Sequence, residues 1–308
     1  MRGTRTRTLR LGVAATSVLA ALLVFGPVAN ATQPECRVEN VSRQLAYNSN
    51  TSGNPLGTAI ERARAGDTLQ VIGTCHGNYV IEKNLTIQGR ASAQHADTID
   101  GDDAGIVLTI PAKPDGNGGF VQGATVRIRN LTITGGHSVW PASAGAAIAN
   151  NGALTVVDAV LRGNSADDRG GGIGNDQWGV ANIVNTTFTE NFSFAGSGIF
   201  NLGLCTVVGS TITRNVSAGG GGGISNQGGQ LTLVNTQVTF NSAHGGGGIE
   251  SYDPAITALT DHTVVTGNEA GIGGGILWWP TLRPTVDGTS SVSGNSASLP
   301  EWADWYPY

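Results

Sequence analysis

The stretch TITRNVSAGGGGGISNQGGQLTLVNTQVTFN, residues 211–241, contains a unit that repeats along most of this chain. An apolar residue stands three positions before an asparagine, a glycine run ends in isoleucine, and a short apolar segment precedes the next asparagine. Aligned copies place the asparagines 24 to 27 residues apart, at Asn164, Asn191, Asn215, Asn241, Asn268 and Asn295. A fixed period in the twenties predicts a solenoid.

A second column closes the glycine runs, and it consists of Ile148, Ile173, Ile199, Ile224, Ile249 and Ile276. The segments between turns, such as LTVVDAVLRGN at 154–164, alternate apolar and polar residues over a few positions. That alternation is typical of short strands. We therefore predict an all-β protein, a single-stranded right-handed parallel β-helix in which each strand pairs with its copy one coil on.

The turns of this predicted solenoid carry asparagine and glycine. The asparagine column should occupy left-handed backbone positions at turns, because a short amide tolerates them, and stacked copies can form an amide ladder. Glycines such as those at 219–223 should supply further positive-φ corners. Glycine is abundant, 47 of 308 residues, which is also a feature of disordered chains. The regular apolar columns favour a folded solenoid, since a disordered chain has no reason to keep them.

The N-terminus has the features of a secretory signal peptide at residues 1–31. Four arginines precede the apolar run 11–28, which ends at Ala29-Asn30-Ala31. A membrane anchor is the alternative, but Gly26-Pro27 interrupts the run. We expect a secreted, extracellular product with no membrane span. Loss of four positive charges would change the formal net charge from −5 to −9, which excludes a basic face for nucleic acid.

Both ends of a stacked parallel sheet expose strand edges that need cover. Residues 54–66, NPLGTAIERARAG, fit a short amphipathic helix that starts near a proline and stops at a glycine. We assign residues 32–66 to an N-terminal segment with this capping helix and residues 67–297 to the β-helix. Residues 298–308, rich in tryptophan, tyrosine and proline, are assigned to an aromatic C-terminal cap.

Three cysteines remain after the predicted cleavage. Cys36 and Cys75 are expected to be bridged in an oxidising compartment. Cys205 falls where Leu154 and Leu231 fall in other coils, which predicts a buried small hydrophobe rather than a reactive thiol.

The segments GDTLQV at 66–71, KNLTIQGR at 83–90 and VRIRNLTITGG at 126–136, with repeated GGGI blocks, resemble secreted right-handed parallel β-helix proteins of the pectin-lyase-like fold. The repeat is similar to that of the chlamydial polymorphic outer-membrane proteins, whose signatures are GGAI and FxxN. This chain has GAAI at 145–148 and FTEN at 188–191. The resemblance covers about residues 56–297 and is specific for the fold, much less so for an activity.

The fold that this chain resembles also occurs in polysaccharide lyases and hydrolases, so its acidic residues are candidate catalytic groups. A lyase needs carboxylates that converge on Ca²⁺ and a basic residue, and a hydrolase needs paired carboxylates. The candidates are Asp102, Asp103, Asp167, Asp168, Asp176, Glu250, Asp253 and Asp261. Most lie one per turn, which favours solvated loop carboxylates. His137, His244 and His262 fall at different phases of the repeat, so no metal site is predicted.

Two surface groups are the candidates for ligand contact. Asp167, Asp168 and Arg169 form a charged turn, and Trp278 and Trp279 are either a platform for sugar rings or packing residues. The leading hypothesis is a monomeric, non-catalytic β-helix that contacts an extracellular polysaccharide or cell-surface component without a cofactor. The alternative is a polysaccharide lyase or glycoside hydrolase, in which case Ca²⁺ would be the cofactor. Carboxylates from adjacent coils that meet beside a basic residue would favour the alternative.

Overall fold

The computed structural model describes residues 35–90, 97–140, 144–252, 254–279 and 281–307. The chain divides into two units, residues 1–32 and residues 33–308, and every element described below belongs to the second. The predicted signal peptide at 1–31 lies outside the described residues. In the described part of the chain, no helix is both long enough and apolar enough to cross a membrane.

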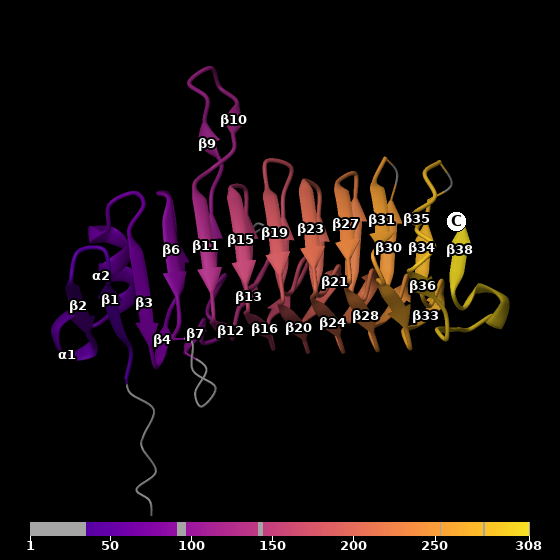
Figure 1. Ribbon diagram of the computed structural model, residues 1–308, viewed down its shortest axis with the longest axis horizontal. Coiled ribbons are helices and arrows are strands. Elements are labelled where there is room, and N and C mark those ends of the chain that lie inside the picture. Colours follow the sequence, from indigo (N-terminus) through magenta and orange to yellow (C-terminus); the bar gives the residue numbers. More distant parts are fainter. Residues whose placement is uncertain (1–34, 91–96, 141–143, 253, 280, 308) are drawn as a thin grey trace, which may run out of the picture. The chain divides into compact units, whose positions relative to one another are not determined.

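The second unit is a parallel β-solenoid of about eight turns, which confirms the predicted all-β fold with stacked coils. Each full coil contributes one strand to each of four sheets, visited in the order sheet 1, sheet 2, sheet 3 and sheet 4. Strands of successive coils lie side by side in sequence order (Figure 1). Each repeat therefore makes its backbone hydrogen bonds mainly with the repeats before and after it.

The strands are grouped here by sheet. Sheet 1 consists of β2 (Leu45–Asn48), β1 (Arg37–Asn40), β3 (Thr68–Ile72), β6 (Leu85–Gln88), β11 (Thr125–Arg129), β15 (Ala153–Val157), β19 (Val180–Val184), β23 (Leu204–Val208), β27 (Gln230–Val234), β31 (Ile256–Thr260) and β35 (Thr285–Val286). Sheet 2 consists of β4 (Thr74–His76), β7 (Thr98–Asp100), β12 (Thr132–Thr134), β16 (Val160–Arg162), β20 (Thr187–Thr189), β24 (Thr211–Thr213), β28 (Gln237–Thr239), β32 (Val264–Thr266) and β36 (Ser291–Val292). Sheet 3 consists of β13 (His137–Ser138), β17 (Ser165–Ala166), β21 (Phe192–Ala195), β25 (Val216–Gly220), β29 (Ser242–Gly245), β33 (Glu269–Ile272) and β37 (Ser296–Ala297). Sheet 4 consists of β5 (Tyr79–Val80), β8 (Leu108–Ile110), β14 (Ile148–Asn150), β18 (Ile173–Asn175), β22 (Ile199–Asn201), β26 (Ile224–Gln227), β30 (Ile249–Tyr252), β34 (Ile276–Trp278) and β38 (Trp305–Pro307).

The apolar columns of the sequence form the core. Successive isoleucines of sheet 4, such as Ile224 and Ile249, are register partners and fully buried. Cys205 pairs with Leu231 in sheet 1 and is buried without a disulfide, as predicted. Burial of these columns supplies most of the driving force for stacking, because apolar side chains leave water only when coils meet.

The asparagine column forms the predicted amide ladder. From Asn164 to Asn295, each Nδ2 donates to Oδ1 of the asparagine in the next coil at 2.9 to 3.0 Å. The expectation that these asparagines adopt left-handed angles is wrong. The left-handed residue is the one before each asparagine, with φ between 54° and 68°, at Gly163, Glu190, Arg214, Phe240, Gly267 and Gly294. At that residue the chain turns from sheet 2 into sheet 3, while the asparagine points its amide inward to the ladder.

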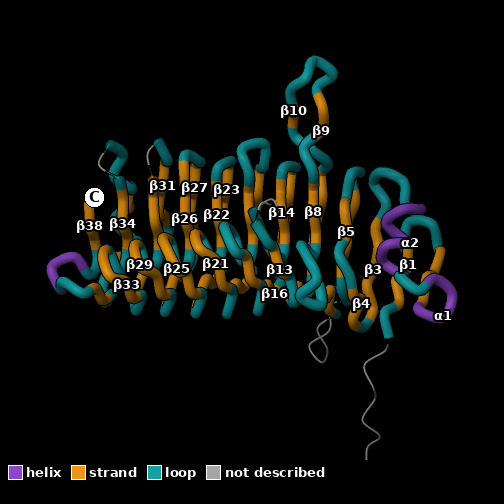
Figure 2. The backbone as a smooth tube through the Cα atoms, turned by 180° about the vertical axis from the view of Figure 1, so that it is seen from behind, coloured by secondary structure: helices purple, strands orange, loops and turns teal. Residues whose placement is uncertain are grey.

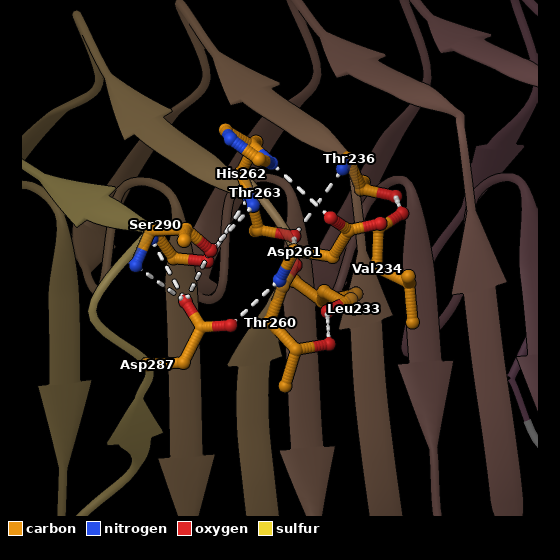
Figure 3. Close-up of polar contacts among 10 residues, drawn as sticks. Leu233, Val234, Thr236, Thr260, Asp261, His262, Thr263, Asp287 and Ser290 are labelled. Carbon is orange, nitrogen blue, oxygen red and sulfur yellow. Dashed lines mark hydrogen bonds and ion pairs between the residues drawn. The ribbon is translucent and has the colours of Figure 1, made fainter.

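Two further ladders were not predicted. In sheet 4, Nδ2 of Asn150 donates to Asn175, and the series continues through Asn201 and Asn226 to the hydroxyl of Thr257. Between sheets 1 and 2, backbone N–H groups donate to hydroxyl oxygens of the next coil, at Ser210, Thr236, Thr263 and Ser290. Figure 3 shows the part of this series from Thr236 to Ser290. These bonds satisfy buried polar groups that the turns would otherwise leave without partners.

The N-terminal end of the solenoid contains two short helices and an antiparallel hairpin. Helix α1 spans Ser49–Ser52, and α2 spans Pro55–Arg62 with Asn54 as its N-cap, shorter than the predicted 54–66. The chain becomes extended at Ala63, which ends α2. Strands β1 and β2 pair antiparallel and occupy the outermost positions of sheet 1, and α2 packs against them. The hairpin was not predicted, since it has no copy in the repeat.

The predicted disulfide between Cys36 and Cys75 is present and joins β4 to the segment just before β1. At the other end, the segment 298–308 that was predicted as a cap also contributes a strand to the solenoid. A short 3-10 helix at Pro300–Trp302 is followed by β38, which extends sheet 4 in parallel with β34. A hairpin of β9 (Lys113–Pro114) and β10 (Phe120–Val121) projects from one turn of the solenoid (Figures 1 and 2).

Candidate functional site

The charged turn predicted as a ligand contact lies between β17 and β18. Arg169 Nε donates to Oδ2 of Asp168 at 2.8 Å, and its guanidinium lies 4.9 Å from the ring centroid of Phe200. Asp167 is exposed, and its backbone N–H donates to Ser138 O. The guanidinium and the Asp168 carboxylate therefore already interact within their own turn.

Trp278 and Trp279 are adjacent in sequence but lie in different environments. Trp278 is buried, with its ring edge-on to Trp305 at 5.7 Å between centroids. The Arg283 guanidinium lies over both rings, 5.7 and 5.2 Å from their centroids. Trp278 thus packs against the last coil, which contains β38. Trp279 follows the end of β34, is partly exposed and packs on Tyr252 at 4.4 Å between ring centroids.

The two predicted groups do not form one site. The turn at 167–169 follows β17, and the tryptophan pair belongs to the coil that contains β33, which is four coils further along sheet 3. At about 4.8 Å between paired strands, this places them roughly 19 Å apart along the axis. Two further tryptophans, Trp140 and Trp178, are exposed; Trp178 follows β18 in the coil of the charged turn, and Trp140 follows β13 in the coil before it.

Trp279 instead belongs to a cluster on the outer face of sheet 4. Along β26, β30 and β34 the isoleucine points inward, so the residues one and three positions later point outward. Register pairing brings Ser225 beside Glu250, and Gln227 beside Tyr252. Trp279 continues the second row in the next coil. We call Ser225, Gln227, Glu250, Tyr252 and Trp279 the sheet 4 cluster.

The carboxyl group of Glu250 is the polar centre of the sheet 4 cluster. Ser225 Oγ donates to Oε2 of Glu250 at 2.7 Å, and Gln227 Nε2 donates to Ser225 Oγ at 3.2 Å. A Cβ at Gly220 would collide with the carboxyl group of Glu250, so a side chain at this position would displace that carboxyl group. Burial raises the pKa of Glu250, and the hydrogen bonds from Ser225 and Gln227 oppose the shift only in part.

No cation neutralises this carboxyl group in the described part of the chain, since none of its ion pairs includes Glu250. Asp253, another predicted candidate, lies outside the described residues. The carboxylate oxygens of Glu250 accept hydrogen bonds, and the side-chain amide of Gln227 can both donate and accept them. Next to it, Tyr252 and Trp279 offer aromatic surface, and Tyr252 is 39% exposed. The cluster therefore combines an apolar ring surface with hydrogen-bonding groups of both kinds.

Sequence reasoning selected Glu250 and Trp279 separately and missed Ser225, Gln227 and Tyr252. A signal for them was present. Relative to the isoleucine column at 224, 249 and 276, the cluster occupies the first and third following positions. Because the strands alternate, those two positions of every coil share the outer face.

Comparison with known proteins found no matching family model, no matching relative among curated proteins and no matching solved structure.

Proposed function

We propose that this protein is a secreted β-solenoid of the pectin-lyase-like type, with repeats like those of the polymorphic outer-membrane proteins, that binds an extracellular polysaccharide without cleaving it. The single observation that carries the proposal is the packing of Trp279 on Tyr252 beside the hydrogen-bonded Glu250. The predicted signal peptide at residues 1–31 and the disulfide support export to an oxidising compartment.

The sheet 4 cluster has the chemistry that sugar recognition needs. Aromatic rings with one polar edge pack against apolar surface while they remain partly in water. A sugar presents apolar C–H faces and a rim of hydroxyls, so the rings of Tyr252 and Trp279 would contact the face. Gln227 and Glu250 lie one coil apart and would bond the hydroxyls. The solenoid repeats along its axis as a polysaccharide does, which favours a chain over a single sugar.

A neutral polysaccharide is the favoured class. The chain has a formal net charge of −5, and the cluster contains an acidic group with no cationic partner in the described residues. Polyanions such as polyuronates would meet repulsion from both sources. A neutral polysaccharide would not be repelled by either source of negative charge.

The test is affinity electrophoresis of the secreted protein through gels that contain neutral or acidic polysaccharides. Retardation by a neutral polysaccharide should be lost in Trp279→Ala and Tyr252→Ala. Trp178→Ala is the matched control, because Trp178 also lies just after a sheet 4 strand, 39% exposed, but four coils away. Retention of binding by both cluster variants, or equal loss in the control, would reject the proposed site.

A lyase or glycoside hydrolase is the second candidate, and the raised pKa of Glu250 favours it. A carboxyl group whose pKa is raised by burial is better suited than an exposed one to protonate a leaving group. Incubation with polysaccharides, with and without Ca²⁺, would be followed by assays for reducing ends and unsaturated products. Turnover that Glu250→Gln abolishes would replace the binding proposal by catalysis. Binding without products supports the binding proposal.

A further inference from the structure

Three side chains with metal-binding atoms converge near the N-terminal end of sheet 2, far from the sheet 4 cluster. One ligand atom from each of His76, Asp100 and Asp102 lies within 4.8 Å of the other two. His76 Nδ1 is 2.7 Å from Oδ1 of Asp102. In the described residues this is the one group of three or more such side chains with this geometry.

Two features of the fold, strand pairing and a tight turn, hold these residues in place. His76 ends β4 and Asp100 ends β7, and the two are register partners in neighbouring coils. Asp102 lies in the turn that follows β7, where Asp102 and Asp103 both have φ of 54°. The turn closes by a hydrogen bond from Ala104 N to Gly101 O, and Asp102 N donates to Asp100 Oδ1 at 3.0 Å. Strand pairing and the turn thus bring the ligand atoms together before any ion binds.

We propose that His76, Asp100 and Asp102 form a binding site for a divalent transition metal, with Zn²⁺ as the ion that fits best. One imidazole nitrogen and two carboxylate oxygens are ligands that Zn²⁺ accepts at tetrahedral sites with a water as the fourth ligand. His76 and Asp102 are exposed, so water has access to the open position. Ca²⁺ suits the site poorly, because it takes six to eight oxygen ligands.

A second histidine–aspartate pair makes the same contact, but no third ligand atom lies close to it. His262 Nδ1 lies 3.1 Å from Oδ1 of Asp261 (Figure 3). The nearby carboxylate of Asp287 accepts hydrogen bonds from Asp261 N, Ser290 N and the Thr289 hydroxyl instead. The ligand atoms of His262, Asp261 and Asp287 do not all lie close enough to one another to hold a metal ion. The His76 group therefore differs from an ordinary surface pair by its third ligand atom.

The bound ion would join the first two coils of sheet 2. His76 follows the disulfide-bonded Cys75, so the disulfide and the metal would hold the same strand from its two sides. An ion that binds only the folded state stabilises that state by an amount that grows with the logarithm of its concentration once this exceeds Kd. Zn²⁺ should thus raise the melting temperature of the protein.

The test is isothermal titration of the tag-free secreted protein with ZnCl₂ after treatment with a chelator, together with thermal unfolding at each Zn²⁺ concentration. One Zn²⁺ per chain is expected, with at least a tenfold loss of affinity in His76→Ala and in Asp102→Asn. His262→Ala is the matched control and should bind as the wild type does. CaCl₂ should give neither heat nor a change in melting temperature.

Circular dichroism of His76→Ala before titration shows whether the variant is folded, and its exposed side chain leads us to expect that it is. Zn²⁺ binding that survives His76→Ala, or that His262→Ala removes, would overturn the proposal. Absence of binding by the wild type would do the same. None of these outcomes bears on polysaccharide binding by the sheet 4 cluster, which lies in other coils.

Discussion

The carboxylate of Asp304 accepts two hydrogen bonds from Asn295, one from the backbone N–H and one from Nδ2, both at 3.0 Å to Oδ1. Each asparagine from Asn191 to Asn295 receives the same two bonds at its Oδ1 from the asparagine of the coil before it, as Asn241 does from Asn215. Asp304 takes the place of the next asparagine, although it lies only nine residues further along the chain. The C-terminal segment therefore ends the ladder with a charged acceptor.

Removal of this acceptor should loosen the last coil. Asp304→Ala leaves the Asn295 N–H without an acceptor and its Nδ2 with Val265 O alone, and we expect a loss of about 1 to 2 kcal/mol in the free energy of unfolding. Asp304→Asn keeps an acceptor oxygen and should cost less. Urea unfolding, with amide hydrogen exchange in β36–β38, measures both effects. An equal loss in the two variants would show that the charge, and not the ladder bond, is what matters.

Removal of an asparagine from the middle of the ladder should lower the free energy of unfolding more than removal of its last acceptor does. Asn215 is fully buried; its Oδ1 accepts from Asn191 N and Nδ2, and its Nδ2 donates to Asn241 Oδ1. Asn215→Ala leaves the buried N–H of Asn191 without an acceptor and its Nδ2 with Leu161 O alone, which should cost about 3 kcal/mol. The exposed Gln237, one coil on in sheet 2, supplies the control Gln237→Ala, with a change below about 0.5 kcal/mol. Urea denaturation of the two variants measures this difference, and similar midpoints for both would contradict a structural role for the ladder.

The raised pKa of Glu250 predicts how stability changes with pH. A folded-state pKa above the ordinary 4.5 means that the folded protein holds this proton more tightly than the unfolded chain does. The stabilisation is fully present below pH 4.5 and is lost as the pH rises through the folded-state pKa. Glu250→Gln should therefore be at least as stable as the wild type at pH 7, with a flatter profile. Thermal unfolding from pH 4 to pH 8 would count against this if the variant lost stability at neutral pH.

The three cysteines should respond differently to substitution. The disulfide closes a loop with a sequence separation of 39, so Cys36→Ser or Cys75→Ser should lose roughly 3 to 4 kcal/mol. Opening of this end would also expose strand edges, so these variants should associate, as light scattering can show. Burial raises the pKa of the Cys205 thiol to about 12, so it should react with iodoacetamide only after denaturation. Alkylation of Cys205 in the native protein would place it outside the core.

Much of the fold followed from periodicity. The column through Ile224 predicted both the parallel pairing and the inward direction of its side chains, because equivalent residues of stacked coils lie side by side. The asparagine ladder followed for the same reason. The left-handed residue did not, since Glu190 and Phe240 occupy that position as well as glycine, and neither residue type indicates positive φ.

Less of the candidate sites could be predicted. Tyr252 stands three residues after its column isoleucine, as Trp279 does, and the alignment contained that information. His76 and Asp102 are 26 residues apart, one coil length, yet His76 lies outside the part of the chain where the columns are regular. Only the register of β4 against β7 shows that the imidazole meets the two carboxylates.

The amino-acid sequence by itself determined the architecture, because a repeated pattern of apolar and turn residues can bury its apolar face only by stacking copy on copy. Tertiary structure alone decided the features that have no copy: the antiparallel β1–β2 hairpin at one edge, the strand Trp305–Pro307 at the other, and the meeting of His76 with Asp102. The physical reason is that a periodic signal accumulates over many coils, whereas each of these contacts occurs once. A single contact depends on turn geometry and side-chain direction, which residue types restrict only weakly.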